Sequence, residues 1–242
     1  MLKPEGYYKY TILIKISADL MVSFKQFLQE GVNDPAIFKA VFLAGGPGSG
    51  KSFVVGKTAL TALGFKVVNS DDAFENAMQK AGMTMDPEDI FSDKGQMIRG
   101  KAKALTGRKQ VMYITGRLGL VIDGTGKDYN KIKSQRDQLE KLGYETAMIF
   151  VNTDKETALE RNRQRDRSLP DDQVIKMWNA VQGNIGKFQG VFGQNLYIVD
   201  NSNGVDIDQG VLRAYREIQK WTKAPPRNGL AQRWIKQQRA KK

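Results

Sequence analysis

The stretch Gly45-Gly-Pro-Gly-Ser-Gly-Lys-Ser52 decides which fold we expect for this chain. It matches the full pattern of a phosphate-binding P-loop, in which two glycines separated by four residues precede lysine and serine or threonine. The apolar run 39–43 predicts a buried strand before the loop, and residues 51–63 predict a helix after it. Backbone N–H groups of the loop and of the helix N-terminus can then surround a phosphate group.

The residues of this loop are expected to divide the work of holding a nucleoside triphosphate such as ATP. Lys51 reaches the β- and γ-phosphates, and Ser52 binds Mg²⁺ through its hydroxyl group. The chain has no histidine and no cysteine, which favours an oxygen-liganded ion such as Mg²⁺ over a transition metal. The expected nucleotide-binding residues are Gly45, Gly46, Pro47, Gly48, Ser49, Gly50, Lys51 and Ser52.

Strand and helix patterns alternate along the rest of the chain. This alternation predicts an α/β fold with a doubly wound parallel sheet, whose functional residues lie at the carboxyl ends of the strands. A loop is predicted over 82–93, and a helix break at Gly107. Further strands are predicted at 65–69, 119–123, 144–151 and 196–199, and further helices at 71–80, 94–116, 128–142, 154–165, 170–187 and 207–221.

The core of residues 39–221 is expected to carry an appendage at each end. The N-terminal extension, residues 1–38, has patterns of an edge strand at 8–16 and a helix at 23–30. The C-terminal segment 222–242 contains seven basic residues and no acidic one, in a chain of net charge +12. Two interpretations of this segment stay open, a solvated tail and a contact to nucleic acid.

Composition also bears on where the protein acts. The chain has no run of 18 apolar residues and no secretion-signal pattern, so we expect no contact with a membrane. The lack of cysteine is compatible with a reducing compartment, and we expect a cytoplasmic protein. The oligomeric state is not predicted.

Two carboxylates follow predicted strands and face the expected phosphate position. Asp71 comes 20 residues after Lys51, and a carboxylate there can accept the proton of an attacking hydroxyl group. The alternative is a helix N-cap with an acidic first turn, in which Asp71 and Asp72 share the two roles. Asp123 ends the third strand, where a carboxylate can contact Mg²⁺; a purely structural turn is the alternative.

Arginines recur at every second position from 161 to 167. In a helix Arg161 and Arg165 share one face, and Arg163 and Arg167 share roughly the opposite one. At most one pair can therefore point at the phosphates, where an arginine would stabilise the charge on the transferring group. The alternative is a solvated run of charges.

These sites occur in an order that resembles the small P-loop kinases, which include phage polynucleotide 5′-hydroxyl kinases and the zeta toxins. The resemblance spans about residues 39–200. It implies a sheet order of 2-3-1-4-5 and transfer of the γ-phosphoryl group of ATP to a hydroxyl group. It further implies that Asp71 is the base that contacts the acceptor, that Thr125 contacts the acceptor, and that Arg161 and Arg165 are lid arginines.

One position departs from the family pattern. Polynucleotide kinases carry an arginine three residues after the catalytic aspartate, and this chain has Phe74 there. The acceptor class therefore stays open between a polynucleotide 5′-hydroxyl, which the positive charge favours, and a nucleotide-sugar or small nucleotide as in zeta toxins. A nucleic-acid-binding ATPase or switch is a further alternative.

Overall fold

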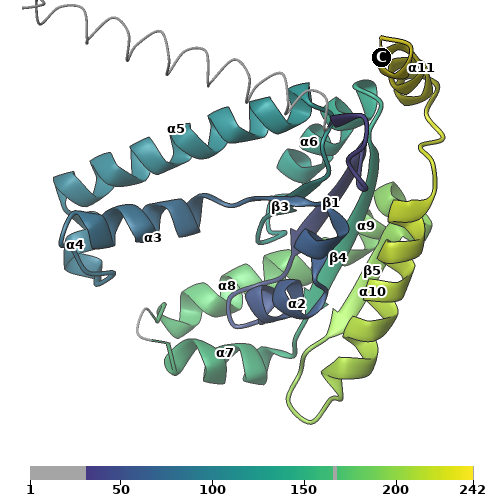
Figure 1. Ribbon diagram of the computed structural model, residues 1–242. Coiled ribbons are helices and arrows are strands. Elements are labelled where there is room, and N and C mark those ends of the chain that lie inside the picture. Colours follow the sequence, from purple (N-terminus) through teal and green to yellow (C-terminus); the bar gives the residue numbers. More distant parts are fainter. Residues whose placement is uncertain (1–30, 166–167, 242) are drawn as a thin grey trace, which may run out of the picture.

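The computed structural model describes residues 31–165 and 168–241 (Figure 1). The strand and helix predicted at 8–16 and 23–30 lie outside these residues. The described elements include the strands β1 (Lys39–Ala44), β2 (Lys66–Val68), β3 (Leu120–Asp123), β4 (Glu145–Asn152) and β5 (Leu196–Asp200). The α-helices are α2 (Lys51–Lys57), α3 (Ser70–Lys80), α4 (Pro87–Phe91), α5 (Asp93–Thr115), α6 (Tyr129–Lys141), α7 (Lys155–Arg163), α8 (Asp171–Gln182), α9 (Ile185–Phe192), α10 (Ile207–Lys223) and α11 (Gly229–Arg239).

The five strands form one parallel sheet in the order β2-β3-β1-β4-β5, as predicted. β1 lies at the centre, and all six of its residues are buried. Its residues 40–44 are all apolar, and such a buried apolar run is typical of a parallel sheet that is covered on both faces. The register pairs Leu43 with Asp123, which brings the ends of β1 and β3 to the same edge of the sheet.

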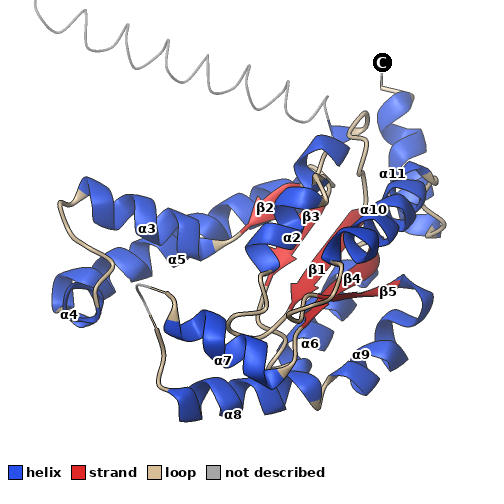
Figure 2. Cartoon of the chain, turned by 90° about the horizontal axis from the view of Figure 1, so that it is seen from below, coloured by secondary structure: helices blue, strands red, loops and turns tan. Residues whose placement is uncertain are grey.

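Helices cover both faces of the sheet, as Figure 2 shows. Side chains alternate between the faces along β1, since successive residues of a strand point to opposite sides. Val41 and Leu43 pack with residues of α2 and α10. Ala40, Phe42 and Ala44 pack with residues of α6 and α9. The doubly wound α/β architecture is therefore confirmed.

The helices α3, α4 and α5 form an arm that projects from the end of β2 (Figure 1). A small apolar cluster holds the arm together, and its buried members are Phe74, Met78, Ile90, Ile98 and Ala102. The loop predicted over 82–93 is confirmed for residues 82–86 and wrong beyond them, because Pro87 starts the short helix α4 and Ile90 is buried in that cluster. The break predicted at Gly107 is also wrong, because α5 runs unbroken through this exposed position.

Two predicted helices are shorter than expected. The helix after the P-loop ends at Lys57, because Ala59 turns into the left-handed region and Leu60 enters the core. The helix predicted over 170–187 is interrupted between α8 and α9. At the interruption Asn184 donates hydrogen bonds from its side chain to the carbonyl oxygens of Gly126 and Lys127, both at 3.0 Å. Buried polar contacts thus decided this boundary.

The C-terminal helix α11 packs against the core. Ala231 is fully buried, and Trp234 lies edge-on to Phe38 with ring centroids 5.5 Å apart. The interpretation of residues 222–242 as a solvated tail is therefore wrong for this part. Within the described residues, no helix is both long enough and apolar enough to span a membrane.

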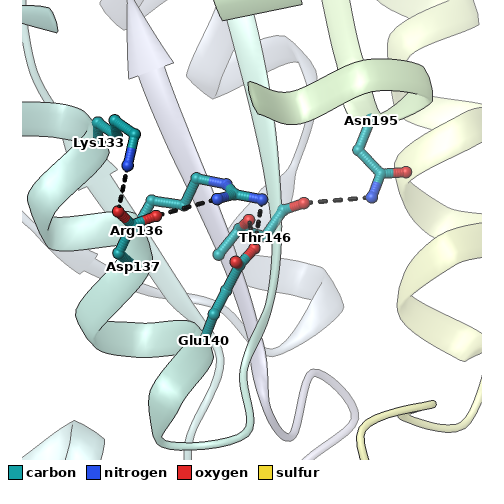
Figure 3. Close-up of polar contacts among 6 residues, drawn as sticks. All are labelled: Lys133, Arg136, Asp137, Glu140, Thr146 and Asn195. Carbon is teal, nitrogen blue, oxygen red and sulfur yellow. Dashed lines mark hydrogen bonds and ion pairs between the residues drawn. The ribbon is translucent and has the colours of Figure 1, made fainter. Parts of the chain in front are cut away.

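A chain of polar contacts fastens α6 to β4 and to the segment before β5 (Figure 3). Arg136 contacts Asp137 at 3.1 Å and Glu140 at 2.8 Å. Glu140 accepts a hydrogen bond from the Thr146 hydroxyl at 2.9 Å, and Asn195 donates to the Thr146 carbonyl oxygen at 3.2 Å. This network lies at the start of β4, at the opposite end of that strand from the P-loop side.

Candidate active site

The P-loop joins the end of β1 to the start of α2, as predicted. Gly48 and Gly50 have φ angles of 73° and 78°, a backbone region that other residues enter only at a cost. A Cβ atom at Gly48 would lie 2.5 Å from the Ala158 carbonyl oxygen, and one at Gly50 would lie 2.3 Å from Nδ2 of Asn201. The loop therefore requires glycine for its conformation and for the close approach of its neighbours.

Asn201, directly after β5, holds the P-loop from outside. Its side chain donates a buried hydrogen bond of 2.7 Å to the Ser49 carbonyl oxygen. Its own carbonyl oxygen accepts a 2.8 Å hydrogen bond from Arg161. Sequence reasoning missed this residue, although its place at the carboxyl end of a strand was a usable signal.

Lys51 is the first residue of α2, and its ammonium group donates to the Gly45 carbonyl oxygen at 2.8 Å. Burial lowers the pKa of Lys51 below its ordinary value; Asp123 and Asp71 act against this shift, and Arg165 adds to it. Two carboxylates and one guanidinium group are therefore close enough to act on the ammonium group through their charge. The surroundings of Lys51 thus include three of the predicted site residues.

Asp123 ends β3 beside the P-loop. Its Oδ1 atom is buried and has no hydrogen-bond partner among the described residues. Burial raises the pKa of this carboxyl group, Lys51 opposes the rise, and Asp71 adds to it. An unpaired buried carboxylate oxygen is costly unless a cation or donor satisfies it. Asp123 and the exposed Ser52 hydroxyl are oxygen ligands of the kind that Mg²⁺ prefers, so the site fits this ion.

The helix α3 begins directly after β2, and Asn69 is its N-cap. The Asn69 side chain accepts a hydrogen bond from the Asp71 backbone N–H at 2.8 Å and donates to Asp72 at 3.3 Å. The capping role thus belongs to Asn69. Among the described residues the Asp71 carboxylate makes no side-chain hydrogen bond, and it is close enough to influence both Lys51 and Asp123.

The arginines behave differently from one another. Arg161 donates to the backbone carbonyl of Asn201 and to the side chain of Asn203, at 2.8 and 3.1 Å. Arg163 forms an exposed ion pair with Asp171, outside the phosphate site. Because α7 ends at Arg163, Arg165 lies beyond the helix, and the prediction that Arg161 and Arg165 share one helix face is wrong. Arg165 nevertheless influences Lys51.

Thr125 lies in the turn after β3, next to the P-loop. Its carbonyl oxygen accepts a hydrogen bond of 3.0 Å from the Gly45 N–H, and its side-chain oxygen accepts from the Lys127 N–H at 3.5 Å. Thr125 and Asp123 both line a cavity of about 200 Å³ that extends along the start of α6. The structure thus brings Thr125 and Asp123 together at one opening.

Comparison with known proteins agrees with this architecture. A family model described as an AAA domain matches residues 41–183. Adenylate kinase isoenzyme 5 of Bos taurus is 27% identical over 134 residues, which are 54% of this chain and 23% of that protein. The chain therefore matches less than a quarter of the length of this curated relative.

Two solved structures share the fold at low sequence identity. The AvrRxo1-ORF1:AvrRxo1-ORF2 complex with ATP is 16% identical, with a TM-score of 0.53 and coverage of 83% of this chain and 69% of that chain. A structure from the PezAT toxin-antitoxin system of Streptococcus pneumoniae is 14% identical, with a TM-score of 0.51 and coverage of 85% and 95%. Since the family model covers more than half of the chain, the protein belongs to the AAA domain family, and it shares its fold with these two solved structures.

Proposed function

We propose that this protein transfers the γ-phosphoryl group of ATP to a hydroxyl group of an acceptor. The observation that carries the proposal is the pair of carboxylates beside the partly buried Lys51 ammonium group: Asp123, whose buried Oδ1 has no partner among the described residues, and Asp71, which acts on both groups through its charge. They follow two neighbouring strands, β3 and β2. A protein that only binds ATP needs the lysine and the metal ligand. A carboxylate without a side-chain partner beside them supplies the base that a transfer reaction requires.

Each part of the site has a role in holding ATP. The P-loop N–H groups and the N-terminus of α2 bind the β- and γ-phosphates, with Lys51 adding positive charge. Ser52 and Asp123 would hold Mg²⁺, which neutralises charge on the β- and γ-phosphate oxygens. Arg165, which acts on Lys51 through its charge, would stabilise the charge on the transferring group.

Asp71 acts on the acceptor. As the acceptor oxygen forms its bond to the γ-phosphorus atom, the bond from that phosphorus to the β–γ bridging oxygen breaks and ADP leaves. Asp71 takes the proton that the acceptor hydroxyl loses. Thr125, which lines the same cavity as Asp123, would orient the acceptor by hydrogen bonding.

The leading acceptor is the 5′-hydroxyl end of a polynucleotide. The net charge of +12 favours a polyanion, and an acceptor of this kind brings its own phosphates to the site. A nucleotide-sugar or small nucleotide is the runner-up. We propose that the reaction takes place in the cytoplasm, where ATP is available and where a chain without cysteine needs no oxidising conditions.

The change Asp71→Asn tests the proposal. It removes the base while keeping the size of the side chain and the cap made by Asn69. With γ-labelled ATP and a 5′-hydroxyl oligonucleotide or a nucleotide-sugar, transfer is expected to fall by about 10²- to 10⁴-fold. ATP affinity, measured by equilibrium titration, is expected to stay at the wild-type level.

Asp72→Asn is the matched control, because Asp72 lies next in sequence and, among the described residues, its side chain hydrogen-bonds only to the capping side chain of Asn69. Its charge acts on Asp123 less than that of Asp71 does. It is expected to retain transfer. Equal activity of Asp71→Asn and wild type would remove Asp71 from the mechanism. Release of free phosphate that rises with nucleic acid, with no label on any acceptor, would instead support the ATPase alternative.

A further inference from the structure

The helix α5 has a second apolar side, which the described part of the chain leaves exposed. On its inner side α5 packs beside α3 through the buried Ile98 and Ala102 (Figure 1). The guanidinium carbon of Arg99 lies 4.8 Å from the centre of the Phe74 ring on the same side. Further large apolar side chains on α5 are each between 47% and 64% exposed, and they are Met97, Leu105, Val111 and Met112. One exposed apolar residue is ordinary, but four on one helix form a patch of the kind that marks an interaction surface.

Basic residues lie in the middle of this exposed side. A helix turns by about 100° per residue, so the four apolar residues lie within an arc of about 120° around its axis. Lys101 and Arg108 lie between Met97 and Leu105 in that arc, and both are exposed. Lys94, Lys101 and Arg108 recur at every seventh position, which is two turns of the helix. We call this surface the outer stripe, and its residues are Met97, Lys101, Leu105, Arg108, Val111 and Met112.

The charge of α5 indicates the chemistry of what binds there. The helix contains six basic residues and one acidic residue. A surface that combines apolar side chains with cations is complementary to one that combines apolar side chains with carboxylates. Residues 1–30 of this chain contain four basic and three acidic residues, so they do not supply that complement. A second copy of α5 would bring the same positive charge, and the occupant is therefore a different protein.

Two glycines beside the outer stripe favour a helix as the occupant. Gly100 and Gly107 are also seven residues apart, and a Cβ atom at either would meet no atom within 4 Å. Neither has a positive φ angle, and glycine inside an exposed helix is less favourable than alanine. No contact in the described residues therefore requires glycine at these positions. A second helix can approach the backbone of α5 closely there.

Two other anionic surfaces fit the outer stripe less well. A helix that lies on a lipid surface keeps its apolar side chains on one face and its basic side chains on the polar face. Here Lys101 and Arg108 lie within the apolar arc, where lipid would surround them. Nucleic acid is bound mainly through its phosphates, which would leave Met97 and Val111 without a partner. An amphipathic protein helix satisfies both kinds of side chain.

We propose that the outer stripe of α5 binds an amphipathic helix of a partner protein, whose apolar side carries a carboxylate at every seventh residue. The carboxylates lie opposite Lys101 and Arg108, and apolar side chains of the partner cover Met97, Leu105, Val111 and Met112. The inference goes beyond the proposed function, because it assigns a protein-binding surface and uses no residue of the phosphate site.

The probe for this surface is a synthetic helical peptide of about 21 residues, which is three repeats of seven. Its apolar stripe of leucine is interrupted by glutamate at every seventh position, and a second peptide carries lysine at those positions. Fluorescence anisotropy with the labelled peptides measures their affinity for the whole 242-residue chain. The glutamate peptide is expected to bind at least about 10-fold more tightly than the lysine peptide, because the latter places like charges opposite Lys101 and Arg108.

Two double variants test the charged and the apolar parts of the outer stripe separately. Lys101→Glu with Arg108→Glu is expected to weaken binding of the glutamate peptide by about 10-fold or more, and to bind the lysine peptide in its place. Met97→Gln with Val111→Gln keeps both charges and is expected to weaken binding of the glutamate peptide as well. All four side chains are exposed, so the fold is expected to persist in both variants.

The control is Arg213→Glu with Arg216→Glu, which reverses two exposed charges on α10 and is expected to bind the glutamate peptide as wild type does. No binding of that peptide to wild type, or equal affinity for the two peptides, would overturn the proposal. Binding that persists unchanged in Met97→Gln with Val111→Gln would also overturn it, since charge alone would then account for the affinity.

Vesicles of anionic phospholipid and a single-stranded oligonucleotide test the two other surfaces. Wild type is expected to bind neither of them through the outer stripe. Binding of one of them that is lost in Lys101→Glu with Arg108→Glu, without any binding of the glutamate peptide, would assign the stripe to a lipid surface or to nucleic acid instead.

Discussion

Gly48 offers a direct test of how the P-loop and α7 depend on each other. The change Gly48→Ala adds one methyl group at a φ angle of 73°. The added Cβ would lie 2.5 Å from the carbonyl oxygen of Ala158 and 3.0 Å from its Cα atom. Both are backbone atoms of α7, so no rotation of a side chain can relieve the contact.

The expected loss of stability has two parts. An alanine in the left-handed region costs about 1–2 kcal/mol relative to glycine. Forcing extra volume into a packed site costs about 1–3 kcal/mol more, because backbone must shift. The shift moves α7, which carries Arg161 and its contact to Asn201. We therefore expect a lower free energy of unfolding and a weaker affinity for ATP.

Gly82→Ala is the matched control. Gly82 has a φ angle of 68°, but a Cβ atom there would meet no atom within 4 Å. It therefore carries the backbone cost without the clash. Chemical denaturation gives the free energies of unfolding, and equilibrium titration gives ATP affinity. Gly82→Ala is expected to lower the free energy of unfolding by about 1–2 kcal/mol and to keep the wild-type affinity for ATP. Gly48→Ala is expected to lower the free energy of unfolding further and to weaken ATP binding. Equal losses in the two variants would refute the close packing of α7 on the P-loop.

Two further predictions concern charged residues of the site. The pKa of Lys51 in the folded protein lies below its ordinary value of 10.5. At pH values between these two pKa values the unfolded chain therefore binds more protons than the folded one. The free energy of unfolding of the nucleotide-free protein consequently rises with pH in that range. Lys51→Met removes a cation whose burial is costly, so thermal unfolding without nucleotide is expected at a higher temperature than in wild type near neutral pH. That difference should shrink as the pH approaches 10.5, and a constant difference would contradict the role of burial. Arg165→Gln is expected to lower kcat by about 100-fold, as for the loss of one group that stabilises the transition state. Arg163→Gln, which loses only an exposed ion pair with Asp171, is expected to retain kcat, and similar kcat values in the two variants would argue against Arg165 as the residue at the phosphates.

Local chemistry explains which parts of the fold could be predicted. The order of the strands was implied by the family resemblance, and the buried strands were visible as apolar runs. Helix ends were harder to predict, because they depend on contacts with distant residues. The boundary between α8 and α9 lies at Asn184, whose side chain is held by carbonyl groups of the turn after β3.

In the candidate site, too, some residues could be predicted from the sequence and one role could not. The P-loop sequence was sufficient to place Lys51 and Ser52, because its glycines and its position between strand and helix determine the backbone conformation. Asp71 and Asp123 could be identified as carboxylates after strands, and the parallel sheet then brings them to one edge. It was not predicted that Asp71 leaves the capping of α3 to another residue. In the folded chain Asn69, two residues earlier, is the N-cap of this helix.

The sequence by itself predicted a loop that can bind a nucleotide phosphate, because the pattern of glycine, lysine and serine is enough to build the loop. Only the tertiary structure decided which partners the arginines have, with Arg163 paired to Asp171 and Arg99 stacked on the Phe74 ring. The physical reason is that Phe74 and Arg99 are 25 residues apart in the chain but lie on two helices that pack side by side. Neither local sequence predicts such a contact.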